Sequence, residues 1–185
     1  MSEYRNPVFE QLLRSGLPID WTVIRMGWET YDFLIRDQLL DYAMEQLGLC
    51  PDDQFDIVSS LAFADPGDTW TLRRCLEQLA SKRPDDRDRA TRIWRCVLFN
   101  DLIQEVEKQV LDAIETPSVD FDEYYSFADY LLEKFYEFDT QFSSLDHNPP
   151  IDVSADLPET RDLLRSHRQW LDRERSKIAL PGETE

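Results

Sequence analysis

The chain has 185 residues, a length that fits one domain with a full-sized hydrophobic core. Its hydrophobic content of 42% and aromatic content of 12% argue against a disordered chain, and its apolar runs are too short for a membrane span. The net charge of −18 argues against nucleic acid or anionic lipid as a partner and would steer cationic surfaces toward the protein.

The chain opens with two short predicted helices. Asn6 is the predicted N-cap and Pro7 the first residue of the first helix, which Gly16 ends. Asp20 is predicted to cap the second helix, over residues 21–28. The side chains of both caps can accept hydrogen bonds from free backbone N–H groups at the helix start, and proline has no N–H group to leave unpaired.

A longer helix is expected over residues 31–47, directly after Thr30, with Gly48 as the glycine that follows its C-terminus. The helical spacing of its apolar residues predicts that it buries Phe33, Leu34, Leu40, Ala43, Met44 and Leu47.

Two further helices should follow, over residues 55–64 and 69–82, separated by a turn at residues 65–67. Asp68 is the predicted cap of the second of these helices. Its inner side is expected to carry Leu72, Cys75, Leu76 and Leu79, together with either Trp70 or Thr71.

Pro84 opens a helix predicted to reach about Glu115, with a break near Asn100 as an alternative because this length is unusual in a globular protein. Its expected inner side comprises Ile93, Trp94, Val97, Leu98, Leu102, Val106, Val110 and Leu111.

A helix from Asp120 to Phe142 is expected next, then a proline-containing loop, then a last helix from about residue 158 to 179. The inner stripe of the first is predicted to be Tyr124, Phe127, Leu131, Phe135, Phe138 and Phe142, and the last helix should make contacts through Leu163, Leu164, Trp170, Leu171 and Ile178.

These elements predict an all-α fold, a single compact bundle of about seven helices. We expect residues 1–150 to form a helical core domain. Residues 151–185, a loop plus a basic C-terminal helix, are expected to belong to the same domain, and whether this helix docks on the core is left open.

No catalytic signature is present, so we expect a protein that is not an enzyme and that needs no cofactor or metal. His147 and His167 are expected to be surface residues, and no histidine spacing typical of a metal site occurs. Cys75 and Cys96 are expected in the core. The N-terminus lacks the features of a signal peptide, so the expected location is the cytoplasm.

The charge is unevenly distributed. Residues 73–95 carry eight basic and four acidic groups, whereas residues 96–160 carry two basic and 16 acidic groups. We expect the basic groups to form internal salt bridges with the acidic helices. The acidic excess can serve solubility alone or attract a basic partner.

The segment from Asp120 to Asp139 combines seven carboxylates with eight aromatic rings. Beside its inner stripe, a second line of tyrosines and acids would form a recognition surface, in which tyrosines anchor a partner and carboxylates supply steering. The predicted partner-binding residues are Asp122, Tyr125, Asp129, Glu133, Tyr136, Glu137 and Asp139. The alternative is that Tyr125 and Tyr136 pack against a neighbouring helix, such as the arginine-rich last one.

Five landmarks carry a resemblance: residues 19–28, 37–47, 55–63, 92–102 and 134–150. In this order they resemble a bacterial family of small cytosolic helical domains of unknown function, some proposed as immunity proteins of polymorphic or contact-dependent toxin systems. The family's aromatic–acidic motif, Tyr-x-x-Phe-Asp, is resembled by residues 135–139, Phe-Tyr-Glu-Phe-Asp, with Phe135 at the tyrosine position, and Pro149-Pro150 closes it. This chain lacks the Tyr-Pro that follows the motif and adds the basic helix.

The resemblance implies a binding role without catalytic residues. The leading hypothesis is an immunity-type protein that neutralises a cognate basic toxin domain, such as a nuclease, by stoichiometric binding. The second is a helical scaffold or regulator that self-associates as a homodimer through its basic and acidic segments. A third, weaker hypothesis is an enzyme whose carboxylates act through a bound divalent metal.

Overall fold

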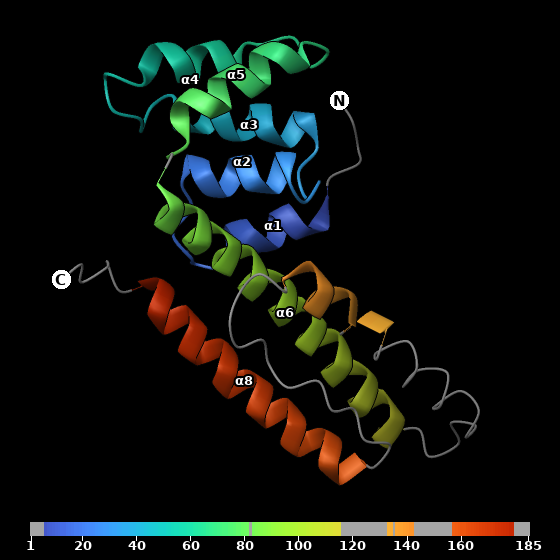
Figure 1. The fold of residues 1–185 in the computed structure, drawn as a ribbon. Coiled ribbons are helices and arrows are strands. Elements are labelled where there is room, and N and C mark those ends of the chain that lie inside the picture. Colours follow the sequence, from blue (N-terminus) through green and yellow to red (C-terminus); the bar gives the residue numbers. More distant parts are fainter. Residues whose placement is uncertain (1–5, 82, 116–132, 135, 143–156, 180–185) are drawn as a thin grey trace, which may run out of the picture. The chain divides into compact units, whose positions relative to one another are not determined.

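The computed structural model describes residues 6–81, 83–115, 133–134, 136–142 and 157–179, with the side chains of 109–115, 157–163 and 179 excepted. These ranges contain helices and no strand, which confirms the all-α class (Figure 1). The labelled helices are α1 (Pro7–Arg14), α2 (Trp21–Glu29), α3 (Arg36–Gln46), α4 (Phe55–Ala62), α5 (Thr69–Leu79), α6 (Pro84–Glu115) and α8 (Leu157–Ala179). Residues 133–134 and 136–141 are also helical.

The chain divides into two compact units, Met1–Trp94 and Arg95–Glu185, here called the first and second unit. Their boundary lies inside α6, between Trp94 and Arg95, close to the point where the basic stretch 73–95 gives way to the acidic stretch 96–160. The domain boundary expected at residue 150 stays a prediction.

The first two helices begin where their caps predict. The Asn6 side chain accepts a hydrogen bond from the Val8 N–H at 3.0 Å, and Gly16 takes a left-handed φ of 69° just beyond α1. The Asp20 carboxylate accepts from the N–H groups of Thr22 and Val23, both at 2.9 Å. Local chemistry therefore sets both N-termini.

The third helix, α3, begins later than predicted. It begins at Arg36 and not at residue 31, because Asp32 takes a left-handed φ of 56° that no helix continues through. Gly48 has no left-handed φ. Of the residues expected to be inside, Leu34 and Ala43 are buried and Met44 is 45% exposed, while the buried face of α3 comprises Gln38, Leu39, Tyr42 and Ala43.

The helices α4 and α5 form as expected, and α4 packs against both α3 and α5. The Asp68 carboxylate caps α5 by accepting from the Thr71 N–H at 3.0 Å. Hydrogen bonds from the Thr71 hydroxyl and N–H hold the pKa of Asp68 below its ordinary value. Leu72, Cys75 and Leu76 are buried, whereas Trp70 is 68% exposed, so Trp70 does not lie on the inner side.

The helix α6 is continuous, without the break considered near Asn100. Trp94 is fully buried in the first unit, and its indole N–H donates to the Val23 carbonyl at 2.8 Å. The ring packs directly against Gly27, where an added Cβ would come within 2.2 Å of it. This contact explains why a glycine stands inside α2 despite its helix cost.

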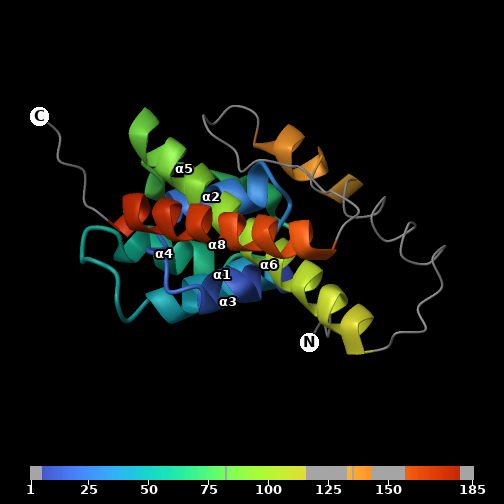
Figure 2. The same cartoon turned by 90° about the horizontal axis from the view of Figure 1, so that it is seen from below.

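In the second unit, α8 packs along the part of α6 that begins at Arg95 (Figures 1 and 2). Trp170 contacts Phe99 edge-on, with ring centroids 5.0 Å apart. The contacts expected from Leu164, Trp170, Leu171 and Ile178 are confirmed by their burial, and the last helix therefore docks on this part of α6. Leu163 lies outside the described side chains.

The expected surface position of His167 is wrong. Its side chain is fully buried and lies edge-on to Phe99, with ring centroids 5.1 Å apart. The charged stretch around it suggested solvent exposure, but the helical turn brings His167 onto the same face as Trp170. His147 lies outside the described residues.

The expectation of internal salt bridges holds for several basic residues. In the first unit Arg73 lies 3.4 Å from Glu29, and Arg89 pairs with Asp20. In the second unit Arg168 pairs with Glu107, which raises the pKa of Arg168 by hydrogen bonding and by charge. These bases partly neutralise the acids of their own units.

Candidate interaction surface

The helical residues 133–134 and 136–141 hold the described part of the predicted recognition surface. Phe138 and the adjoining Phe142 are buried as expected, with ring centroids 5.1 Å apart, and Phe138 also contacts Phe99 of α6 at 5.0 Å. Tyr124, Phe127, Leu131 and Phe135 of the expected inner stripe lie outside the described residues. The two phenylalanines fix which side of this short helix faces its unit, and so which side faces outward.

Tyr136 lies on the outward side and is 73% exposed. Glu133 is exposed as well, the Glu137 side chain is 59% exposed, and Asp139 is half-buried. The alternative that Tyr136 packs against the arginine-rich last helix is therefore wrong. The other predicted residues, Asp122, Tyr125 and Asp129, lie outside the described residues.

A shallow pocket of about 170 Å³ lies beside this surface. It is lined by Leu98, Asp101, Leu102, Glu105, Lys134, Glu137, Phe138 and Gln141. The Lys134 ammonium pairs with the Glu137 carboxylate at 2.8 Å, so one of the three acids that line the pocket is offset locally. An apolar floor with an acidic rim suits a cationic or amphipathic contact more than a small anion.

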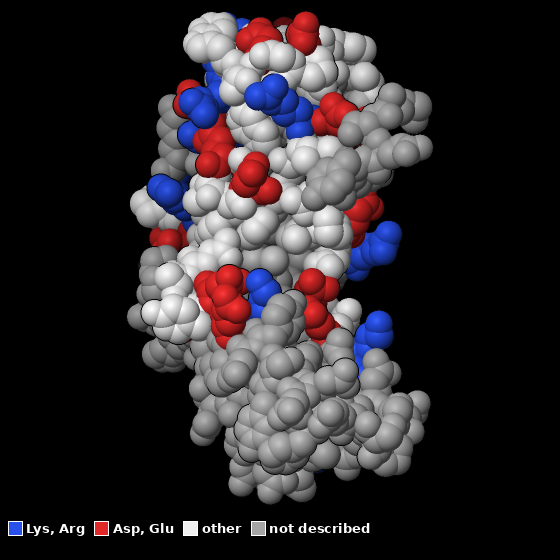
Figure 3. All heavy atoms as spheres, turned by 90° about the vertical axis from the view of Figure 1, so that its right-hand side faces the viewer, with Lys and Arg blue, Asp and Glu red and all other residues white. Residues whose placement is uncertain are grey.

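The described side chains do not form a uniform acidic field. On the face drawn in Figure 3, acidic and basic side chains are interspersed, with uncharged surface between them. Of the 16 acidic residues in 96–160, those with described side chains are Asp101, Glu105, Glu107, Glu133, Glu137 and Asp139.

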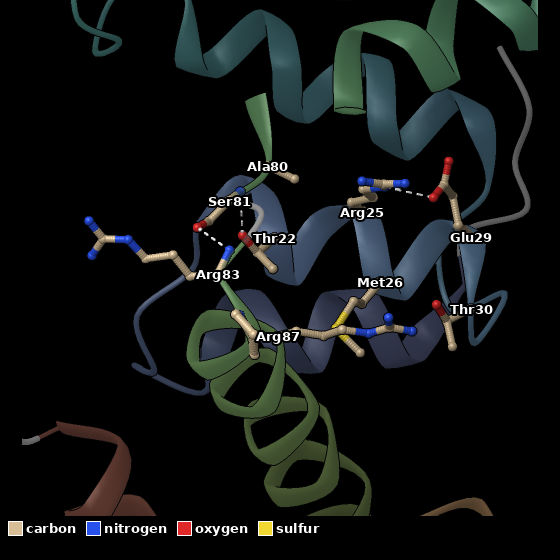
Figure 4. Close-up of a pocket in the computed structure, with 10 residues that line it drawn as sticks. Thr22, Arg25, Met26, Glu29, Thr30, Ala80, Ser81, Arg83 and Arg87 are labelled. Carbon is tan, nitrogen blue, oxygen red and sulfur yellow. Dashed lines mark hydrogen bonds and ion pairs between the residues drawn. The ribbon is translucent and has the colours of Figure 1, made fainter. Parts of the chain in front are cut away.

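A larger pocket, of about 440 Å³, lies in the first unit between α2 and the start of α6 (Figure 4). Its charged lining residues point in different directions: Arg25 pairs with Glu29 at 2.7 Å, the guanidinium of Arg83 extends away, and Arg87 lies across the Met26 side. Because these charges do not converge, the pocket offers no arrangement typical of catalysis or of anion binding.

The sequence interpretation overlooked the surface chemistry of the first unit. Residues 37–72 contain eight acidic side chains and no lysine or arginine, and all eight are exposed. Several of the most exposed large hydrophobic residues of the described chain lie in the same stretch, namely Met44, Leu49, Phe55, Phe63 and Trp70. Counting charge in a shorter window would have revealed this stretch, here called the acid-only segment.

Among the described residues, no three histidine, cysteine, aspartate or glutamate side chains come together as metal ligands would. None of the helices in that part of the chain combines the length and the hydropathy that crossing a membrane requires. Cys75 and Cys96 are buried, as expected, and burial raises the pKa of the Cys75 thiol.

The comparisons with known proteins give one finding. No curated protein and no solved structure matches the chain. A family model described as "Uncharacterized protein conserved in bacteria (DUF2247)" matches residues 9–175, which include every described helix from α2 to α6 and most of α1 and α8. The chain therefore belongs to this bacterial family of uncharacterized proteins.

Proposed function

We propose that the protein is an immunity-type protein, which neutralises a cognate bacterial toxin by stoichiometric binding through the surface around Tyr136. The observation that carries the proposal is the exposure of Tyr136, 73% accessible and accompanied by exposed Glu133 and Glu137. A large aromatic side chain left in water next to carboxylates is typical of a binding surface, because it gains most when a partner covers it.

The mode of action follows from this chemistry. Tyr136 would fill a pocket on the toxin, while Glu133 and Glu137 pair with its lysines or arginines and Asp139 lies beside them. The acidic net charge of −18 would speed the encounter with a basic toxin such as a nuclease. Binding of this kind occludes the toxin and needs no catalytic residue on the present chain.

A homodimeric scaffold is the second candidate. It needs basic segments that are available to meet the acids of another copy, but Arg73, Arg89 and Arg168 already form ion pairs within their own units. Light scattering at low and at high salt separates the two candidates, because a charge-driven homodimer loosens as salt rises.

Co-expression with a toxin encoded beside this gene tests the proposal. We expect growth to be restored and a 1:1 complex to elute as one peak on size exclusion. Undiminished toxicity together with the absence of a complex would refute the proposed function.

A further inference from the structure

A groove in the first unit is lined by residues of α1 and α3. Its volume is about 380 Å³. The lining residues are Phe9, Glu10 and Leu13 from α1, and Gln38, Asp41, Tyr42, Met44 and Glu45 from α3. None of them belongs to the surface around Tyr136.

The groove is held in shape by contacts that do not depend on a ligand. The Gln38 side chain accepts from the Asn6 N–H at 3.2 Å and donates to the Asn6 carbonyl at 3.1 Å, which ties the start of α1 to α3. Tyr42 lies edge-on to Phe9 and to Trp21, with centroid distances of 6.2 and 5.3 Å. A preformed groove binds without the entropic cost of ordering its walls.

The exposed lining is both apolar and acidic. Leu13 is 41% exposed and Met44 is 45% exposed. Contact with an apolar group of a partner would remove both side chains from water, which is favourable. Glu10, Asp41 and Glu45 supply three carboxylates, and none of the lining residues that the structure describes is a lysine or an arginine. The groove thus combines apolar contact area with negative charge.

The surroundings increase this negative character. The α3 wall belongs to the acid-only segment, whose eight carboxylates are all exposed. Burial chiefly, and then the charges of Asp20 and Glu45, raise the pKa of Tyr42 to about 12. Arg14 of α1 pairs with Glu10 at 3.9 Å, and because the Arg14 side chain is 81% exposed this ion pair is weak.

We infer that this groove docks a basic segment of a partner protein. Lysine and arginine suit it because their aliphatic stems can cover Leu13 and Met44 while their charged ends reach Glu10 and Glu45. The inference rests on the proposed function for the identity of the partner, a basic toxin, and adds a second contact area on the other unit.

Two synthetic 18-residue helical peptides with equal numbers of lysines provide the probes, one with leucines along one face and one with serines in their place. Each is titrated into the ¹⁵N-labelled full chain at 150 mM salt, and amide shifts report the binding site and Kd. The groove variant is Met44→Gln/Glu45→Lys. Its matched control, Leu49→Gln/Asp52→Lys, likewise replaces an apolar side chain by glutamine and an acid by lysine, at exposed positions outside the groove.

The inference predicts that the leucine peptide shifts amides of α1 and α3, and that the groove variant weakens its binding about tenfold while the control does not. Equal weakening in both variants, or equal binding of the serine peptide, would show a non-specific charge effect and overturn the inference. Absence of binding would overturn it too. If the native molecular mass falls in the groove variant but not in the control, the groove is occupied by a second copy of the chain and not by a partner protein.

This experiment uses no toxin, so its failure leaves the proposed function standing. Conversely, the co-expression test does not depend on the groove. If the toxin complex forms, the same variant pair should separate the two contact areas: the groove variant should lower toxin affinity about tenfold relative to its control.

Discussion

The guanidinium of Arg95 on α6 donates a hydrogen bond to the carboxylate of Glu174 on α8, and both side chains are almost wholly buried. The Arg95 guanidinium also lies 4.9 Å from the centre of the Trp170 ring, and Lys177 reaches Glu174 at 2.8 Å. The two opposite charges thus compensate each other in the interior of the second unit, where either group alone would be costly to keep charged.

This pairing predicts that Glu174→Gln destabilises the protein by about 3–5 kcal/mol, because it leaves the Arg95 charge buried without its partner carboxylate. The double variant Arg95→Met/Glu174→Leu should regain most of this loss, since apolar side chains of similar size need no compensation. Urea unfolding monitored by circular dichroism measures both. Equal stability of the two variants would contradict the compensation argument.

The contact between Gly27 and Trp94 predicts a large effect of one methyl group. Gly27→Ala places a Cβ within 2.2 Å of the Trp94 ring, so we expect a loss of about 1–3 kcal/mol despite the better helix propensity of alanine. Gly48→Ala is the matched control, because nothing lies within 4 Å of its added Cβ. It should be neutral or slightly stabilising, and equal melting temperatures for the two variants would rule out the close contact.

The surface around Tyr136 predicts a separation of binding from stability. Tyr136→Ala/Glu133→Lys should abolish protection against the toxin while changing stability by less than about 1 kcal/mol, since both side chains are exposed. The control Phe63→Ala/Asp52→Lys makes similar changes at exposed positions of the first unit and should retain protection. A collapse of the melting temperature in the first variant would instead assign Tyr136 a packing role.

Tyr42 predicts a loss of stability at alkaline pH. Its pKa in the folded protein is about 12, above the ordinary value of 10, so folding favours the protonated phenol. This contribution is fully present below pH 10 and is lost as the pH rises through 12. Tyr42→Phe, which cannot ionise, should lose less stability than the natural chain between pH 10 and 12. Thermal melts across this range test the difference, and parallel curves would contradict it.

Local signals in the sequence predicted much of the fold. Asn6, Asp20 and Asp68 cap helices through groups two or three residues away, and such contacts can be inferred from the sequence. The start of α3 was missed because the left-handed conformation of Asp32 has no strong signal when the residue is not glycine. The burial of Phe138 and Phe142 followed from spacing alone.

The site was less predictable because it depends on contacts between distant segments. His167 is buried against Phe99, 68 positions away. Its spacing from Leu164 and Trp170 puts it on the inner face of the last helix, but its polar side chain and charged neighbours favoured the surface. The groove between α1 and α3 depends on the hydrogen bonds between the Gln38 side chain and the Asn6 backbone, which are 32 positions apart in the sequence. Exposure of Tyr136 could be proposed from helical periodicity but not decided by it.

The dependence of Arg95 on Glu174 limits where this chain can be shortened. A protein ending at residue 150 would keep Arg95 and Phe99 but lose Glu174, His167 and Trp170, so the Arg95 cation would lose this carboxylate and the Phe99 ring would be uncovered. The C-terminal helix is thus not a removable appendage. Gene fragments that omit it are expected to yield aggregated or degraded product, so expression and crystallisation trials should carry the chain through Ile178.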